Sequence, residues 1–202
     1  MQFLSLDYLV VVILSVVLIV GAYQFYFWCQ RQYIRHRKGL LTFIDSWFGY
    51  RPGWVWIYSG LYYPVIVFTT LTISDMRHFV YTAFSYFILL AAQMAFFLLF
   101  PVESPIQWRR LVSGKSISDK FLRFVQKFDA DSNCFPSMHV SVATLTAFHI
   151  VANKPQLGLW IFLFPLFIAL SCLYTKRHYF LDIMPGAFLG WIVFKIYKLI
   201  YF

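Results

Sequence analysis

Two histidines and one aspartate stand in short polar segments that border apolar stretches of the sequence. His139 lies in FPSMHVS (residues 135–141), and His178 lies in YTKRHYFLD (residues 174–182). Asp182 follows His178 by four residues, so the two would share one helical face. A carboxylate bonded to one imidazole nitrogen fixes the tautomer and leaves the other nitrogen able to attack. The spacing predicts an oriented nucleophile, His178, and a second histidine, His139, that gives or takes a proton.

Groups that could hold a phosphate lie beside both histidines. Pro136 suits the first turn of a helix, where the following backbone N–H groups and the Ser137 hydroxyl would form an anion-binding helix N-terminus. Lys176 and Arg177 directly precede His178 and are candidate phosphate ligands. A nucleophile, its orienting carboxylate, an acid and a cationic pocket are the parts that phosphoryl transfer through a phosphohistidine needs.

A metal site built from the same residues is the alternative interpretation. Histidine and aspartate are common metal ligands, but no further Cys, His or Glu stands at ligand spacing beside His139, His178 and Asp182. The three cysteines of the chain are scattered and show no metal-binding spacing. We therefore predict no metal and no cofactor. The other histidines are interpreted as interfacial or packing residues: His36, His78 and His149.

The composition indicates an integral membrane protein. Of the 202 residues, 61% are hydrophobic and only 12% are charged, whereas roughly 25% are charged in ordinary soluble domains. A helix needs about 20 apolar residues to cross a bilayer, and six stretches reach or approach that length. We expect one all-α, polytopic, membrane-embedded domain over residues 1–202, with six transmembrane helices at residues 6–28, 54–72, 79–100, 138–152, 157–174 and 182–202.

A further helix is predicted in the polar loop between the third and fourth spans. Apolar side chains recur there at helical spacing: Phe121, Phe124, Val125 and Phe128. Ser116 followed by Asp119 resembles a capping box. Basic residues form the other side: Lys120, Arg123 and Lys127. We predict an amphipathic helix at the membrane interface.

The net charge of +9 is unevenly distributed. With six spans, both termini share one side and the loops with the two histidines share the other. All but four of the 17 Lys and Arg residues fall on the histidine side; the exceptions are Arg77, Lys154, Lys195 and Lys198. This basic face suits anionic lipid or phosphate, whereas nucleic acid is a poor partner because the charges sit in short loops. The positive-inside rule would place it in the cytoplasm.

Together these segments resemble the type-2 phosphatidic acid phosphatase superfamily of membrane lipid phosphatases and phosphotransferases. Its second motif, PSGH, is matched by residues 136–139, with Met138 in place of glycine. Its third motif, SRxxxxxHxxxD, is matched by residues 171–182, with Cys172 where arginine is expected. The segment SCLYTKRHYFLD is most similar to the inositol-phosphorylceramide-synthase-like branch, whose third motif reads roughly STLYTKQHYxxD.

The resemblance implies a role for each residue of the site. His178 would be the nucleophile with Asp182 as its charge partner, His139 would protonate the leaving group, and Ser137 would help to hold phosphate without a metal. Lys176 would supply the charge lost at Cys172. The family's first motif, KxxxxxxRP, has no clear match, but PVESPIQWRR lies in the corresponding place. Its two arginines are therefore further candidate phosphate ligands: Arg109 and Arg110.

Three functions follow as alternatives. The first is a lipid phosphatase that hydrolyses a phosphomonoester or diphosphate on a lipid through a phosphohistidine. The second is a phosphotransferase that moves a phospho-headgroup to an alcohol acceptor, and the third is a non-catalytic lipid-binding scaffold. The partners are a phosphorylated lipid and the bilayer; the lipid class and the oligomeric state stay open.

Most members of the resembled family work on the outer or luminal face. Because the basic loops can serve to bind anionic lipid, we expect that orientation, in the plasma (inner) membrane.

Overall fold

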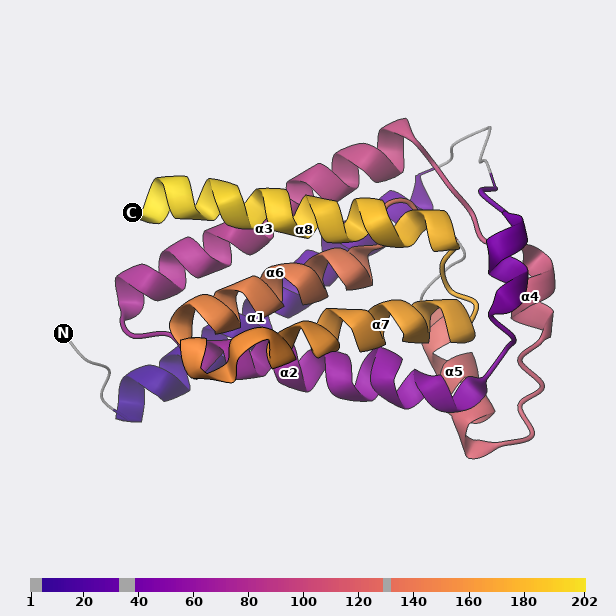
Figure 1. The fold of residues 1–202 in the computed structure, drawn as a ribbon, viewed down its shortest axis with the longest axis horizontal. Helices are drawn as coiled ribbons and strands as arrows, with labels where there is room; N and C mark the ends of the chain where they lie inside the picture. The colour runs from indigo at the N-terminus through magenta and orange to yellow at the C-terminus, as the bar shows by residue number, and fades with distance from the viewer. Residues whose placement is uncertain (1–4, 33–38, 129–131) are drawn as a thin grey trace.

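The computed structural model describes residues 5–32, 39–128 and 132–202, and this part of the chain is built of helices and connecting loops. The predicted all-α class is confirmed. Six helices run along the length of the molecule (Figure 1): α1 (Ser5–Arg31), α2 (Tyr62–Thr70), α3 (Met76–Leu99), α6 (Met138–Asn153), α7 (Leu163–Tyr174) and α8 (Phe180–Tyr201).

Shorter elements gather at the end of the bundle opposite the chain termini (Figure 1). They are η1 (Phe43–Trp47), η2 (Pro52–Trp54), α4 (Ile106–Arg110) and α5 (Ile117–Phe128). Two other short helical segments extend long helices: η3 (Trp56–Leu61) leads into α2, and η4 (Pro155–Phe162) leads into α7. The loop helix predicted between residues 118 and 128 is present as α5, and its place at a membrane interface stays a prediction.

Within the described residues, four helical segments are long and apolar enough to cross a membrane: Leu6–Arg31, Met76–Leu99, Pro155–Tyr174 and Phe180–Tyr201. The other two predicted spans are shorter. Helix α6 has 16 residues, or roughly 24 Å at about 1.5 Å per residue, which is less than a hydrocarbon core of about 30 Å. The second predicted span is divided between η3 and α2. The membrane character is thus supported, while the count of six spans stays a prediction.

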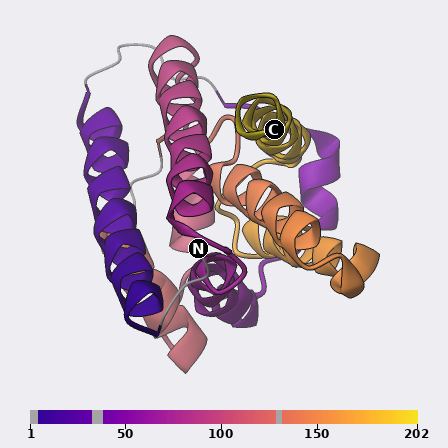
Figure 2. The same cartoon turned by 90° about the vertical axis from the view of Figure 1, so that its left-hand side faces the viewer.

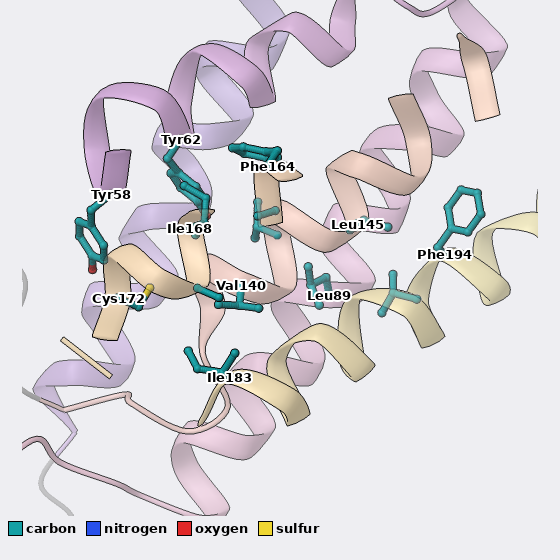
Figure 3. Close-up of a cluster of buried hydrophobic side chains, with 14 of the residues drawn as sticks. Tyr58, Tyr62, Leu89, Val140, Leu145, Phe164, Ile168, Cys172, Ile183 and Phe194 are labelled. Carbon is teal, nitrogen blue, oxygen red and sulfur yellow. The ribbon is translucent and has the colours of Figure 1, made fainter. Parts of the chain in front are cut away.

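Helix α6 occupies the centre of the bundle. It contacts α2, α3, α7 and α8, and the view along the bundle shows it enclosed by these neighbours (Figure 2). The side chains of the main apolar cluster come from α6, from each of those helices and from η3 (Figure 3): Tyr58, Tyr62, Leu89, Val140, Leu145, Phe164, Ile168, Cys172, Ile183 and Phe194. Both ends of α6 are therefore held by packing on several sides.

Capping side chains fix where two of these helices begin. Asp75 is the N-cap of α3, and its carboxylate accepts the His78 backbone N–H at 2.8 Å. Ser137 is the N-cap of α6, and its hydroxyl accepts the Val140 N–H at 3.4 Å. Pro136, which we predicted to lie in the first turn, therefore lies just before the helix. The reason is that serine is a preferred N-cap, so the helix begins at the residue after Ser137.

Two glycines of α8 allow it to approach α6 closely. A Cβ atom at Gly186 would lie 2.7 Å from the Ser137 carbonyl oxygen, and one at Gly190 would collide with the Ser141 carbonyl oxygen. The G-x-x-x-G spacing of these residues is a known signal for close helix packing in membranes. Our sequence interpretation overlooked this pair. The glycines bring the beginnings of α6 and α8 together.

The remaining histidines lie as expected where they are described. His149 is fully buried between α3 and α8; its Nε2 lies 2.9 Å from the Ser85 hydroxyl, and its ring packs edge-on against Tyr197. The ring of His78 stacks on Tyr201 at a centroid distance of 5.2 Å. Both are packing residues. His36 lies outside the described residues.

We predict that Gly186→Ala and Gly190→Ala each lower the stability of the protein by about 1–3 kcal/mol, because the added methyl group overpacks the α6–α8 contact. Thermal unfolding in detergent measures the effect. Gly21→Ala on α1 is the matched control, since its new Cβ would have no atom within 4 Å. That substitution should be neutral or stabilising by up to about 1 kcal/mol, as alanine is the better helix former. Unchanged melting of Gly190→Ala would contradict the close contact.

Candidate active site

The structure brings His139 and His178 together at the end of the bundle where α6 and α8 begin. Their ring centroids are 6.0 Å apart. The two segments are also joined through the backbone, because the Ser137 N–H donates to the Asp182 carbonyl oxygen at 3.0 Å. The two motifs found in the sequence therefore lie side by side at one end of the bundle, and their roles in one active site stay a prediction.

A tight turn after α7 presents His178. The Cys172 carbonyl oxygen accepts the backbone N–H groups of Arg177 at 3.0 Å and of His178 at 3.4 Å. Lys176 has a φ of 58°, a left-handed conformation that is uncommon for residues with a side chain. The Thr175 hydroxyl donates to the Ser171 carbonyl oxygen at 2.6 Å. The turn is held by these local bonds, which fix the position of the His178 backbone.

Asp182 orients the His178 ring from the first turn of α8. His178 Nδ1 lies 3.3 Å from Asp182 Oδ2 and 3.0 Å from the Cys134 carbonyl oxygen. Because both neighbours are acceptors, Nδ1 must carry the hydrogen, and Nε2 is the nitrogen with a lone pair for attack. This assignment is inferred from the hydrogen-bond pattern.

One detail of the predicted pair is wrong. His178 and Asp182 do not share a helical face, because α8 begins at Phe180 and His178 lies in the preceding turn. Asp182 is instead a capping residue, whose Oδ2 accepts the Tyr179 N–H at 2.9 Å. The carboxylate that caps the helix also reaches back to the imidazole. Its other oxygen, Oδ1, is buried and has no hydrogen-bond partner among the described residues.

Aromatic residues hold the second histidine. The His139 ring stacks on Tyr58 at a centroid distance of 4.2 Å, and Tyr62 packs against it at 4.9 Å. The Tyr58 hydroxyl lies 3.3 Å from His139 Nδ1. Both tyrosines are buried. Our sequence interpretation did not place them in the site, because nothing in the local pattern links a tyrosine of η3 to a histidine of α6.

The predicted phosphate ligands near the histidines are largely buried. Ser137 is fully buried and its hydroxyl caps α6, while the Arg177 side chain is also buried. Lys176 Nζ donates to the Asp45 carbonyl oxygen at 2.7 Å and lies 5.0 Å from the centre of the Trp108 ring. Partial burial lowers the pKa of the Lys176 ammonium, and the Asp45 charge acts in the opposite direction. Lys176 and Arg177 thus lie in the turn that presents His178. The role of these two cationic residues in binding phosphate stays a prediction.

The two arginines of α4 differ in their surroundings. Arg109 Nη2 donates to the Gln126 carbonyl oxygen of α5, whereas Arg110 is exposed. Helix α4 does reach the site through Trp108, whose ring packs on Tyr179 at 5.0 Å. The assignment of Arg109 and Arg110 as phosphate ligands stays a prediction.

Asp45 is a residue of the site region that the sequence did not indicate. It is buried, and its Oδ1 accepts the backbone N–H of Phe180 at 2.7 Å. Its Oδ2 accepts the N–H and the hydroxyl of Thr42 at 2.7 and 2.8 Å. Asp45 therefore ties η1 to the beginning of α8. The two residues it joins, Asp45 and Phe180, are 135 positions apart, so no local pattern could reveal the contact.

Three potential metal ligands also meet here. One atom each of Cys134, His178 and Asp182 lies within 4.8 Å of the others. His178 Nδ1 carries a hydrogen, which it donates toward Asp182 Oδ2 and the Cys134 carbonyl oxygen. A nitrogen that carries a proton is not a metal ligand. The hydrogen bonds thus account for the cluster, and metal independence of the reaction stays our prediction.

Comparison with known proteins assigns the chain to a family. A family model described as the PAP2 superfamily matches residues 30–196. The chain belongs to this superfamily. The catalytic subunit AUR1 of inositol phosphorylceramide synthase from Saccharomyces cerevisiae is 36% identical over 70 residues, a match that covers 32% of this chain and 16% of that protein. No solved structure matches. The predicted family and branch are confirmed, and they support a membrane enzyme of the lipid phosphatase and phosphotransferase class.

A cavity of about 240 Å³ adjoins His139 in this PAP2 protein. Its walls come from the end of α1, from η3 with the start of α2, and from α5. Nearly all of the lining is apolar or aromatic: Tyr23, Tyr26, Phe27, Tyr58, Ser59, Tyr62, Tyr63, Phe121, Phe124, Val125, Phe128, Met138 and His139. The apolar side of α5, which the sequence indicated, therefore faces this cavity.

Asp119 fastens α5 over the cavity. Its carboxylate accepts the Tyr50 hydroxyl at 2.6 Å, the Ser113 hydroxyl at 2.7 Å and the Ser116 N–H at 3.4 Å. The Asp119 N–H donates to the Ser116 hydroxyl at 3.0 Å, so the capping box predicted from the sequence is formed. Burial opposes the charge, but the hydrogen bonds outweigh it and hold the pKa of Asp119 below its usual value.

We predict that Asp119→Asn loosens α5, which amide hydrogen exchange over residues 112–128 would detect as faster exchange. Because the Asp119 pKa is lower in the folded protein, its stabilising effect is present above the unfolded value of about 3.9 and is lost as the pH falls through the depressed pKa. The wild type should therefore loosen in acid, and Asp119→Asn should show less of this pH dependence. Lys127→Gln on the same helix is the control. Equal protection in Asp119→Asn and wild type would contradict the role of the carboxylate.

Proposed function

We propose that this chain is an integral-membrane lipid phosphatase that hydrolyses a phosphomonoester or diphosphate on a lipid through a phosphohistidine at His178. The observation that carries the proposal is the placement of an Asp182-oriented imidazole beside a second imidazole, that of His139, with ring centroids 6.0 Å apart. A phosphate between the two rings would meet a nucleophile on one side and a proton donor on the other.

In the first step, His178 Nε2 attacks phosphorus and the bond from phosphorus to the lipid oxygen breaks. His139 gives a proton to that oxygen, so the lipid leaves as a neutral alcohol, or as a lower phosphate when the substrate is a diphosphate. The phosphorylated imidazole of His178 keeps its Nδ1–H, and the Asp182 carboxylate stabilises the positive charge that develops there. Asp182 therefore has its largest effect on the charged intermediate.

In the second step, a water molecule attacks phosphorus. His139, which is now neutral, accepts a proton from the water, and the bond from phosphorus to Nε2 breaks. Inorganic phosphate leaves, and both histidines return to their starting protonation states. The predicted phosphate ligands would neutralise the oxygens in both steps: Ser137, Lys176, Arg177, Arg109 and Arg110.

The same proposal includes the arrangement in the membrane. Residues 1–202 form one domain with six spans, the site lies at the surface of the plasma (inner) membrane on its outer face, and α5 lies in the interface beside it. The gathering of α4, α5 and η1 at the site end of the bundle supports this arrangement (Figure 1). A reporter fused after Phe202 tests the orientation, and a signal from the outer side would overturn it.

We predict that His178→Ala abolishes phosphate release from a lipid phosphate in detergent and that His139→Ala lowers kcat by about 10²–10⁴-fold, the usual contribution of a general acid. Turnover by the wild type should persist with a chelator present. The matched control is His78→Gln, a histidine that stacks on Tyr201 at the end of α8 remote from the site. Phosphate release by His178→Ala at the wild-type rate would contradict the mechanism.

A phosphotransferase is the second candidate, and a specific observation favours it. The similarity to inositol phosphorylceramide synthase covers 70 residues at 36% identity, and the third-motif segment also resembles that branch. The chemistry differs only in the second step, where the hydroxyl of an alcohol attacks phosphorus in place of water. His139 would remove the proton from that hydroxyl in the same way.

Product analysis distinguishes the two candidates. A donor lipid labelled in its phospho-headgroup is supplied with an excess of a lipid alcohol, and the labelled products are separated. We predict labelled free phosphate or headgroup phosphate as the main product, as expected for attack by water. Label that moves mainly into the alcohol would instead establish the transferase. The His178→Ala protein should give neither product.

A further inference from the structure

We infer that one hydrocarbon chain of the substrate lipid enters the bundle beside His139 and lies in a continuous apolar channel between α1, α2 and α3. The inference deepens the proposed function, on which it rests, by assigning a binding site to the lipid tail. It starts from the cavity beside His139 and from a second cavity deeper in the bundle. The second cavity has a volume of about 130 Å³ and is lined by α1, α2 and α3.

The two cavities adjoin. Four residues line both of them: Tyr23, Tyr62, Tyr63 and Met138. At this junction the hydroxyls of Tyr23 and Tyr63 are 2.7 Å apart and share a hydrogen bond. Met138 precedes His139 directly in the chain, so the junction lies next to the proposed acid. A chain attached to a phosphate at the histidines would thus have a path from the first cavity into the second.

The deeper cavity presents an apolar surface despite several hydroxyl groups in its lining. The hydroxyls of Ser15, Thr69 and Thr70 donate to carbonyl oxygens of their own helices, at 2.7, 3.3 and 2.6 Å. Their methyl and methylene groups are left to face the space. Two other polar atoms of the lining, Thr82 Oγ1 and Gln93 Oε1, have no hydrogen-bond partner among the described residues. The surface therefore offers few hydrogen bonds to a sugar or phosphate headgroup, whereas a hydrocarbon chain needs none. The occupant it suits is therefore a lipid tail.

The length of the second cavity also fits a tail. Its lining residues on α3 run from Phe79 to Gln93, a rise of about 21 Å along the helix at about 1.5 Å per residue. Half of a hydrocarbon core is about 15 Å thick, so this distance exceeds the depth of one leaflet. The cationic turn with Lys176 and Arg177 lies at the other end, beside the histidines. Phosphate at the basic end and hydrocarbon in the apolar end match the polarity of a lipid.

Helix α1 contributes a wall to both cavities through Tyr23. The family match begins at residue 30, so the α1 residues of the channel lie outside the matched region. Chain selection in this protein would then depend on a helix that the shared family core does not include. This makes the residues of α1 and the facing side of α3 specificity-determining positions.

Filling the deep cavity tests the inference. Ala83 of α3 lines it, whereas Ala91 on the same helix is exposed on the outer side of the bundle. We expect Ala83→Phe to lower kcat/KM for a long-chain lipid phosphate by about 10-fold or more, within the usual range for altered fit in a hydrophobic pocket. A short-chain substrate should be little affected. Ala91→Phe is the matched control and should leave the chain-length preference unchanged. An unchanged preference in a folded Ala83→Phe protein would overturn the channel.

A binding measurement that needs no turnover separates this inference from the proposed function. His178→Ala protein is mixed with a lipid phosphate that carries a photoreactive diazirine at the end of its chain, and the adducts are mapped by mass spectrometry. Adducts on the deep-cavity residues of α1, α2 and α3, lost in the His178→Ala, Ala83→Phe double variant, would establish the channel even if no lipid phosphate is hydrolysed. Adducts confined to exposed side chains would refute it, even if the wild type proves to be a phosphatase.

Discussion

The close contact between α6 and α8 is the constraint on which the site depends. Each helix carries part of the chemistry at its first turn: His139 on α6, and Asp182 on α8 with His178 just before it. The contact is possible because Gly186 and Gly190 lack the atoms that would collide with the α6 backbone. The hydrogen bond from Ser137 N–H to the Asp182 carbonyl oxygen then fixes how the helix ends meet.

Buried polar groups make that arrangement specific. A carboxylate in an apolar bundle is costly unless it is paired and hydrogen-bonded. Asp182 Oδ2 meets this requirement by accepting from the Tyr179 backbone and from the His178 ring, whereas Oδ1 has no hydrogen-bond partner among the described residues. The same carboxylate thus caps the start of α8 and orients the His178 ring. A change in the start of the helix would also turn the imidazole, so local folding and catalytic geometry are coupled at this residue.

The loops at the site end act as a support for these helix termini. Asp45 Oδ1 accepts the Phe180 N–H at the start of α8, and the Asp45 carbonyl oxygen accepts a hydrogen bond from Lys176 Nζ. Trp108 packs against Tyr179 and Lys176. On the other side of the site, Asp119 fastens α5 over the aromatic cavity. Segments that contain no family motif thus shape the surroundings of the histidines.

The sequence by itself determined the helical class, the membrane character and the family, and it predicted the histidines and the aspartate of the candidate site. Apolar segment length and the i, i+4 spacing of His178 and Asp182 are local properties, so they can be recognised without coordinates. The predicted span from residue 138 matches the start of α6, but Pro136 lies just before the helix and not in its first turn, because Ser137 is the N-cap. The helical face predicted for His178 was also wrong, because Asp182 is used as a cap.

Only the tertiary structure decided which distant groups meet. Tyr58 stacks on His139, Asp45 binds the start of α8, and the Cys134 carbonyl oxygen shares His178 Nδ1 with Asp182. These contacts join residues tens of positions apart, and no periodicity or spacing encodes them. The cavities are likewise formed by faces of several helices at once. Their shape follows from how closely the helices pack, which depends on every side chain between them and not on any one segment.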